Sequence, residues 1–368
     1  MRCLFIVQGE GRGHMTQAIA MKRLLEDAGH SVCAALVGTS PRREIPPFFI
    51  EKIGVAVHRF QSPNFVADAS NRGILVGRTI WESLKGLPKF LKSFRVFDEM
   101  LARHQPDLVI NFYEPLFGLY QSVRRERTAS VCIAHQCLSL HPEFPFPSGW
   151  KRDRLMLRFL TRVAALRTSV ILGLSFTPLS AMVSGRIHVV PPLLRPDVFD
   201  CEISSGDYLL VYLMSAGYAA DIEAWHERNP QVVLHCFWDR KDAPDVDRRD
   251  ETLTFNRISD TRFLSLMAGC RGLVTTAGFE SVCEAMYLGK PVLMVPVHGH
   301  YEQMCNAVDG ERAGAGIRSD RFDLDAIMAY LPRHDSATEE FRGWVGSAPE
   351  RIVGVLESVV APVHRPPL

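Results

Sequence analysis

The residues best suited to chemistry are densest between positions 273 and 307, in the stretch LVTTAGFESVCEAMYLGKPVLMVPVHGHYEQMCNA. Gly278 and Ser281 open a helix-like segment, where backbone N–H groups can hold an anion. Glu284, inside that segment, can reach a hydroxyl of the same ligand. Two more polar residues follow the next apolar run, beside the same opening: Glu302 and Gln303. Together these residues suit a sugar attached to a nucleoside diphosphate.

A second group stands near the start of the chain, where Gly9, Gly11 and Gly13 are followed directly by His14. Glycine-rich turns bind pyrophosphate in dinucleotide enzymes, so a nicotinamide or flavin protein is an alternative. Its spacing, G-x-G-x-G, differs from the G-x-G-x-x-G of those enzymes. Histidine titrates near neutral pH, so His14 can take the proton of an attacking hydroxyl. It can equally cap the next helix or line a phosphate loop.

Both groups lie at turns between a strand and a helix. An apolar strand from Arg2 to Gln8 precedes the glycine-rich turn, a helix is expected from Thr16, and the next strand spans Val32 to Val37. In the second group a short apolar run precedes a helix from Phe279 to Leu288 and a strand from Pro291 to Val295. Strands and helices that alternate in this way form parallel sheets, which bind ligands at the carboxyl ends of their strands.

The length of the chain points to two domains. Its 368 residues exceed what one hydrophobic core normally serves. A proline-rich connector, VVPPLLRP at 189–196, separates two halves of similar plan. We therefore predict an α/β protein with two Rossmann-like, doubly wound domains that face each other across a cleft. The predicted limits are 1–195, 196–345 and a C-terminal helix within 346–368.

The segment TAGFESVCE at 276–284, with Glu302 and Gln303 after it, is similar to the donor-binding box of GT-B nucleotide-sugar glycosyltransferases. The box occurs in the UDP-glycosyltransferases of plants and in the peptidoglycan N-acetylglucosaminyltransferase. The resemblance implies that Glu284 binds the ribose hydroxyls and that Glu302 and Gln303 bind the donor sugar. It also implies that the turn lines the diphosphate, through Thr276, Gly278 and Ser281. The plant pattern has His in place of Thr276 and Asn in place of Glu280. An ordinary strand–turn–helix unit is the alternative.

The resemblance extends to three further features. The ending Gly-Arg-Gly-His resembles the first loop of the same enzymes, where a histidine lies at the interdomain cleft. In these enzymes a carboxylate orients the histidine. Glu114 is the acid at the tip of the strand expected from Asp107 to Phe112, so it is the candidate for this role. Alternatively, Glu114 is an acid at the start of the next helix, where the helix dipole favours a negative charge. The C-terminal helix is expected to return to the first domain.

Other residues of the second half complete the expected donor site. Ser215 and Gly217 can place backbone N–H groups at a phosphate. The resemblance implies that Ile258 holds the base through its backbone, with simple core packing as the alternative.

The overall composition argues for a soluble enzyme. With 42 basic and 41 acidic residues, the chain has no general attraction for nucleic acid. No run is long and apolar enough to span a bilayer, and no signal-peptide pattern is present. The nine cysteines include no C-x-x-C pair, which fits reduced thiols in the cytoplasm. His135, His141, His298 and His300 have no metal-ligand spacing, so we expect neither a metal nor a cofactor.

The sequence gives fewer indications of where the molecule that receives the sugar, the acceptor, would bind. An irregular loop at 134–150 precedes a basic amphipathic helix at 150–166, in which four basic residues share one face: Lys151, Arg154, Arg158 and Arg162. Such a helix can lie on an anionic membrane surface, which would make the enzyme peripheral. A solvated face is the alternative. The acceptor is expected to be a small molecule or a lipid-linked glycan.

We therefore expect a metal-independent hexosyltransferase that transfers a sugar from a nucleoside-diphosphate donor, a UDP-sugar, to an acceptor hydroxyl with inversion. A nucleotide-sugar 2-epimerase, which shares the fold and donor pocket, is one alternative. A nucleotide-sugar-binding protein without turnover is another, and it would keep Glu284 but leave His14 unnecessary.

Overall fold

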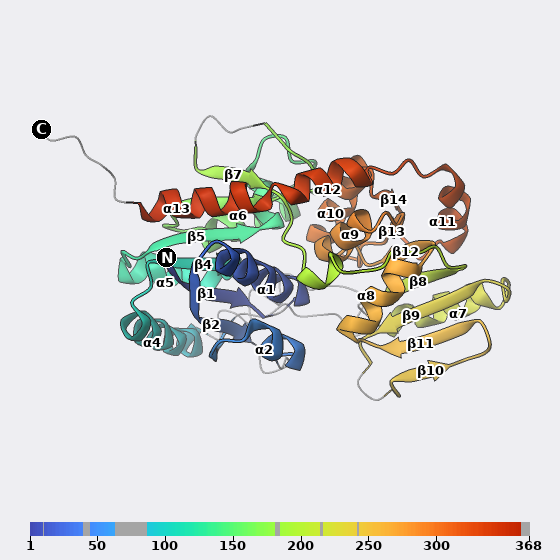
Figure 1. Cartoon of the computed structure of the whole chain (residues 1–368), viewed down its shortest axis with the longest axis horizontal. Helices are drawn as coiled ribbons and strands as arrows, with labels where there is room; N and C mark the ends of the chain where they lie inside the picture. Colours follow the sequence, from blue (N-terminus) through green and yellow to red (C-terminus); the bar gives the residue numbers. More distant parts are fainter. Residues whose placement is uncertain are drawn as a thin grey trace, which may run out of the picture.

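The computed structural model describes residues 1–9, 11–39, 45–62, 87–180, 185–213, 216–240 and 243–361. Over these residues the chain forms two parallel-type β-sheets, each with its own helices (Figure 1). The first sheet and its helices precede residue 191, and the second sheet begins at residue 208.

The first sheet has the strand order β3-β2-β1-β4-β5-β6-β7 and every pairing in it is parallel. Its strands are β1 (Arg2–Gln8), β2 (Ser31–Thr39), β3 (Val57–Gln61), β4 (Leu108–Phe112), β5 (Ala129–Ala134), β6 (Val170–Leu174) and β7 (Ile187–Val190). Its helical segments are α1 (Arg12–Asp27), α2 (Pro47–Ile53), α4 (Leu87–His104), α5 (Pro115–Arg124), the 3₁₀ turn η1 (His135–Leu140) and α6 (Lys151–Ala164). β1 has the limits expected from the sequence, since a parallel strand buried on both faces is a continuous apolar run.

The second sheet repeats this plan in the order β10-β11-β9-β8-β12-β13-β14, with β10 as its one antiparallel strand among the described residues. Its strands are β8 (Tyr208–Leu213), β9 (Val233–Trp238), β10 (Val246–Arg248), β11 (Leu253–Arg257), β12 (Gly272–Thr275), β13 (Val292–Met294) and β14 (Gly316–Arg318). Its helical segments are η2 (Pro196–Val198), η3 (Ala216–Tyr218), α7 (Ala219–His226), α8 (Asp260–Gly269), α9 (Phe279–Tyr287), α10 (Tyr301–Arg312), α11 (Leu324–Tyr330) and η4 (Leu331–Arg333). The predicted doubly wound α/β architecture is confirmed in both halves.

Strand order fixes where a ligand can bind. In the first sheet the order reverses between β1 and β4, and in the second between β8 and β12. Ligands of such sheets bind beyond the carboxyl ends of the strands at this reversal. Those ends carry the glycine-rich turn after β1 and the turn before α9. The two candidate groups of residues therefore occupy equivalent places in the two domains.

The last helices cross from the second domain to the first. These segments are α12 (Thr338–Gly346), the π-helical turn η5 (Pro349–Val353) and α13 (Gly354–Val360). In Figure 1, α13 runs beside β5, against which it packs. Trp344 donates to the carbonyl oxygen of Ser175 at 2.9 Å, and Glu357 lies 3.0 Å from the imidazole of His30. These contacts join the end of the chain to its first domain.

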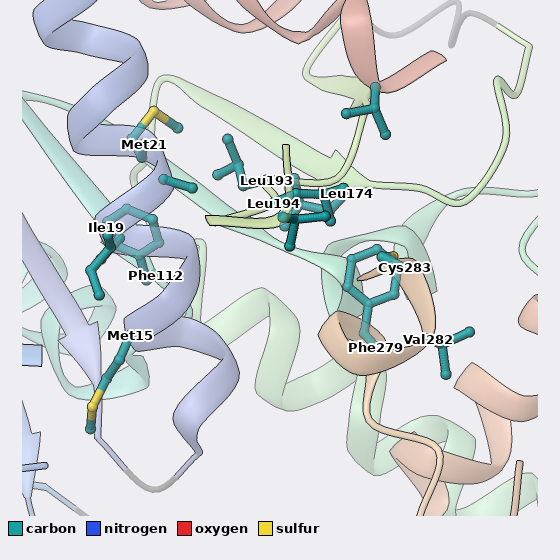
Figure 2. Packing of buried hydrophobic residues seen from close by; sticks show 14 of the residues in the cluster. Met15, Ile19, Met21, Phe112, Leu174, Leu193, Leu194, Phe279, Val282 and Cys283 are labelled. Carbon is teal, nitrogen blue, oxygen red and sulfur yellow. The ribbon is translucent and has the colours of Figure 1, made fainter. Parts of the chain in front are cut away.

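One apolar cluster spans the two domains. It contains the buried face of α1, including Met15 and Ile19, the connector residue Leu194, and Phe279 and Val282 of α9 (Figure 2). Continuous apolar burial holds the two domains in a fixed relation at this edge, because separating them would expose these side chains to water.

Candidate active site

The turn between β1 and α1 packs closely on the neighbouring strand. Gly9 donates its N–H to the carbonyl oxygen of Gly38 at 2.9 Å, and a Cβ at position 9 would lie 2.3 Å from that oxygen. Residue 10 lies outside the described residues. The helix then begins at Arg12, with Gly11 as its N-cap, and not at Thr16 as predicted. Gly11 has no capping side chain and the first turn has no acid, so the usual signals of a helix start are missing.

This earlier start places His14 in the first turn of α1. The side chain is 7% exposed, its Nδ1 lies 3.3 Å from Oε1 of Gln17, and its ring stacks on Tyr113 with centroids 5.9 Å apart. Burial lowers the pKa of His14 below its usual value, and the charge of Glu302 opposes that effect. At neutral pH the imidazole is therefore uncharged, which is the form that a general base needs.

Tyr113, beneath this histidine, has an unusual backbone conformation. Its φ of 58° lies in the left-handed region that favours glycine. Its hydroxyl lies 2.8 Å from that of Thr161 on α6. A non-glycine residue held in this conformation at a strand end is typical of functional sites, where surrounding contacts impose the local strain.

Glu114, the acid predicted to orient His14, is the N-cap of α5. Its Oε1 accepts a hydrogen bond from the Leu116 N–H at 3.0 Å and another from the Ser62 hydroxyl at 2.7 Å. The side chain is fully buried, and the hydrogen bond of His14 goes to Gln17 instead. Glu114 therefore has the helix-capping arrangement that the sequence left open as its alternative.

The donor-box turn lies between β12 and α9. Thr276 is 1% exposed, Ala277 has a φ of 55°, and Gly278 is the N-cap of α9 without a capping side chain. Ser281 donates its hydroxyl back to the carbonyl oxygen of Gly278 at 3.1 Å. Asn306 supports the turn by donating to the carbonyl oxygen of Ala277 at 3.0 Å. Because the Ser281 hydroxyl donates to the carbonyl oxygen of Gly278, it is not directed at a ligand. The groups suited to bind a phosphate here are therefore the backbone N–H groups at the start of α9.

Glu284 is buried in an ion pair with Arg195 of the connector. Nη2 of Arg195 lies 2.8 Å from Oε2 of Glu284, and Nε lies 2.7 Å from Oε1. Only 3% of Glu284 and 6% of Arg195 are exposed. Each carboxylate oxygen can accept more than one hydrogen bond, so the pair does not consume the accepting capacity of Glu284. Sequence reasoning missed Arg195, because 89 residues separate the partners.

Glu302 and Gln303 lie in the first turn of α10. Gln303 accepts a hydrogen bond from the N–H of Val297 at 2.8 Å and is 5% exposed, so it supports the loop before its helix. Glu302 is half-buried, and its charge acts on both His14 and His300. The structure therefore brings Glu302 of the second domain close to the candidate base of the first.

The remaining donor-site candidates are only partly placed. Ser215 lies outside the described residues. Gly217 lies in η3, directly after the end of β8. Ile258 is half-buried between β11 and Ser259, the N-cap of α8. Gly217 and Ile258 thus both follow carboxyl ends of strands in the second sheet.

A contact between α1 and α9 was not anticipated from the sequence. Gln17 donates through Nε2 to Oε1 of Glu280 at 2.6 Å, across 263 residues. A Cβ at Gly13 would lie 3.1 Å from Cγ of Glu280, so this glycine allows the close approach of the two helix starts. Burial raises the pKa of Glu280 to about 8. The one sequence hint was that Glu280 replaces the asparagine of the plant pattern.

No three His, Cys, Asp or Glu side chains in the described part of the chain are arranged to hold a metal ion. Within the same ranges, no helix has both the length and the apolar character needed to cross a membrane.

Known proteins resemble this chain over most of its length. A family model described as glycosyl transferase family 1 matches residues 1–334. An uncharacterized glycosyltransferase of Methanosarcina acetivorans is 24% identical over 366 residues, which cover 90% of this chain and 85% of that protein. The crystal structure of the glycotransferase of kitacinnamycin has a TM-score of 0.64 at 15% identity, covering 97% of this chain and 98% of the other. The spinosyn rhamnosyltransferase SpnG complexed with thymidine diphosphate has a TM-score of 0.60 at 16% identity, covering 97% and 100%.

Proposed function

The chain belongs to glycosyl transferase family 1 and has the GT-B fold, and from this premise we propose that it transfers a sugar from a nucleoside-diphosphate donor to an acceptor hydroxyl with inversion. The observation that carries the proposal is the approach of the two candidate groups. Glu280 of the donor box contacts Gly13 and Gln17 of the helix that carries His14. A base and an anion-holding helix start are the two parts that such a transfer needs.

The proposed donor is a UDP-sugar. Its diphosphate would lie at the N-terminus of α9, where Gly278 leaves the first N–H groups without a capping side chain. Glu284 would accept hydrogen bonds from the ribose hydroxyls, and Glu302 with Gln303 would contact the sugar. Thr276, Gly217, Ser215 and the backbone of Ile258 would complete the site. Thymidine diphosphate, present in the SpnG complex, is a pyrimidine nucleoside diphosphate like UDP, which supports a donor of this class.

His14 would act as the general base. Its Nδ1 faces Gln17, so the nitrogen left for the acceptor is Nε2. The acceptor oxygen attacks the anomeric carbon as Nε2 takes its proton, and the bond from that carbon to the diphosphate breaks. A single displacement of this kind inverts the anomeric centre. The positive end of α9 would stabilise the leaving diphosphate, so that a hexosyl group is transferred without a metal ion or other cofactor.

A product survey tests this function. The protein is incubated with a panel of nucleotide sugars, with and without acceptor extracts, and the products are identified by mass spectrometry. A transferase releases nucleotide faster when acceptor is present and adds the mass of one sugar to it. Conversion of the donor sugar into an epimer without acceptor would indicate the 2-epimerase instead. Binding of the nucleotide sugar without any product would indicate a nucleotide-sugar-binding protein without turnover.

For the acceptor we propose a small molecule or a lipid-linked glycan, met by a cytoplasmic enzyme at an anionic membrane surface. The support is the outer face of α6, where Leu155 is 67% and Phe159 59% exposed. Trp150, just before α6, is 38% exposed. Exposed apolar side chains beside basic ones are typical of helices that lie at a membrane interface.

A further inference from the structure

We propose that Glu280, acting through Gln17, fixes the tautomer of His14, so that the donor-binding domain prepares the base carried by the other domain. The inference deepens the proposed function and rests on it for the role of His14. It makes Gln17 and Glu280 positioning residues, since each acts on the acceptor proton through His14.

Three side chains form a continuous line of hydrogen bonds across the domain interface. Nδ1 of His14 lies 3.3 Å from Oε1 of Gln17, and Nε2 of Gln17 lies 2.6 Å from Oε1 of Glu280. Gln17 is 3% exposed, so water has little access to its amide. Both His14 and Gln17 lie on α1, one turn apart, whereas Glu280 lies in the first turn of α9.

The direction of these bonds follows from which atoms can donate. Oε1 of Glu280 accepts, so the amide of Gln17 must present its NH₂ group to that oxygen. The amide oxygen then faces His14, and an oxygen of this kind can only accept. Nδ1 of His14 must therefore carry the hydrogen, and Nε2 keeps its lone pair. That tautomer is the one a base needs if the acceptor approaches from the Nε2 side.

The direction holds when the proton of Glu280 is not on Oε1, because a protonated Oε1 would donate to the amide oxygen of Gln17 and turn its NH₂ group toward His14. Burial raises the pKa of Glu280 to about 8; the hydrogen bond from Gln17 opposes this rise, the charge of Glu284 adds to it and that of Arg195 opposes it. The relay therefore requires the acid proton to lie on Oε2, so that Oε1 accepts from Gln17 as a carbonyl oxygen. Oε2 is a buried atom without a hydrogen-bond partner in the described part of the chain.

The arrangement has a consequence for coupling between the domains. If the start of α9 moved away from α1, Gln17 would lose its acceptor and its amide could rotate. His14 would then populate both tautomers, and only one of them serves as a base at Nε2. Contact between the domains and competence of the base are thereby linked through one glutamine.

Three variants test the relay. Gln17→Met and Glu280→Met keep the side-chain length but remove the hydrogen bonds, whereas Glu280→Gln keeps an oxygen that accepts from Gln17. We expect each methionine variant to lower kcat by roughly 10–100-fold with KM for the donor little changed, since a misplaced histidine tautomer impairs catalysis. Glu280→Gln should stay within about threefold of the wild type. The double methionine variant should be no slower than the slower single one, because both changes break one relay.

The tautomer itself is measured without reference to activity. Long-range ¹H–¹⁵N spectra distinguish hydrogen at Nδ1 from hydrogen at Nε2, and His14→Gln identifies the signal of this residue among the 13 histidines. We expect hydrogen at Nδ1 in the wild type and in Glu280→Gln, and mostly at Nε2 in Gln17→Met, because a loss of roughly 10–100-fold requires the productive tautomer to become a minor form. Hydrogen at Nε2 in the wild type would overturn the relay.

Activity on a background that lacks the base gives the second decisive result. On His14→Ala, Gln17→Met should cost nothing further; an equal loss on both backgrounds would show that Gln17 acts independently of His14. A failure of the proposed function is separable from these outcomes. It would appear as no transfer by the wild type with any donor, while the spectra would still report the tautomer of His14.

Discussion

The helices α1 and α9 begin in the same way in the two domains and differ in what their first turns present. Each follows a strand at the reversal of its sheet, and each has a glycine N-cap in extended conformation without a side-chain hydrogen bond, Gly11 and Gly278. The first turn of α1 then carries His14 and no acid, whereas that of α9 carries Glu280. The shared backbone leaves N–H groups without a capping side chain at both starts, and the side chains decide which start has a group that could act as a base.

The glycines that precede the two helices differ in how closely they are packed. At Gly9 and Gly13 a Cβ would approach Gly38 and Glu280, so these glycines serve close packing. At Gly278 the nearest atom to a Cβ is the Ser281 hydroxyl at 3.6 Å, which leaves room beside the turn. The glycine-rich turn of the first domain is thus packed against its neighbours, and that of the second is the more open to a ligand.

Removing the base should have the largest effect. We expect His14→Ala to lower kcat by about 10²–10⁴-fold while donor affinity changes little, because general base catalysis contributes on that scale. Steady-state kinetics and donor titration measure the two quantities, with His188→Ala as the matched control on an edge strand. Unchanged turnover would remove His14 from the mechanism and leave α1 with a structural role only.

A change in α9, the helix that carries Glu284, should weaken nucleotide binding rather than turnover. Glu284→Ala should weaken both donor and free nucleoside diphosphate by roughly 10–100-fold, since charged hydrogen bonds contribute about 1.5–3 kcal/mol. It also leaves Arg195 buried without this partner, at a cost of about 3–5 kcal/mol in stability. The double variant with Arg195→Met controls for that loss. Nucleotide affinity that survives Glu284→Ala in calorimetry would contradict the assigned pocket.

Variants of the polar pair on α10, Glu302 and Gln303, test whether these residues contact the sugar or the nucleotide. Glu302→Gln or Gln303→Ala should weaken the intact donor by about tenfold, as one lost hydrogen bond predicts, and leave free nucleoside diphosphate nearly unaffected. Calorimetric titration with both ligands provides the comparison. Equal losses for donor and nucleotide would mean that the pair does not contact the sugar.

The two helix starts should also differ in their response to pH. Burial lowers the pKa of His14 from 6.5, so the loss of turnover on the acid side should lie below pH 6.5. Burial raises the pKa of Glu280 from 4.5 to about 8, so the folded state holds its proton more tightly than the unfolded state does. That stabilising contribution is complete below pH 4.5 and is lost as the pH rises through about 8. Thermal unfolding of wild type and Glu280→Gln at several pH values checks the sign, and parallel curves would contradict it.

The smallest effect is expected on the outer face of the first domain. At low salt the protein should sediment with anionic vesicles and dissociate as salt screens the charges. Reversing the charge of Arg154 and Arg158 should abolish sedimentation, and Leu155→Ser with Phe159→Ser should weaken it. Arg154 lies over the ring of Phe146 at 4.0 Å, so its reversal also disturbs that contact. Lys151→Glu reverses a charge of the same face without touching this contact, and it should also weaken sedimentation. No binding to vesicles at low salt would return α6 to an ordinary solvated face.

Local patterns in the sequence predicted most of the secondary structure around the site. β1 and α9 appear close to the predicted limits, because parallel strands are continuous apolar runs and α9 has an apolar periodicity with Gly289 after it. The start of α1 was missed by four residues, from Thr16 to Arg12, since a glycine N-cap gives no side-chain signal.

The sequence by itself determined the two-domain α/β architecture, the turns that carry His14 and Gly278, and the family resemblance, because all of these depend on residues near one another in the chain. Only the tertiary structure decided that Glu284 pairs with Arg195, that Glu114 caps α5, and that Glu280 reaches His14 through Gln17. A hydrogen bond acts over about 3 Å of space whatever the separation along the chain. Partners 89 or 263 residues apart therefore leave no local pattern, and the packing of α1 against α9 is what brings them together.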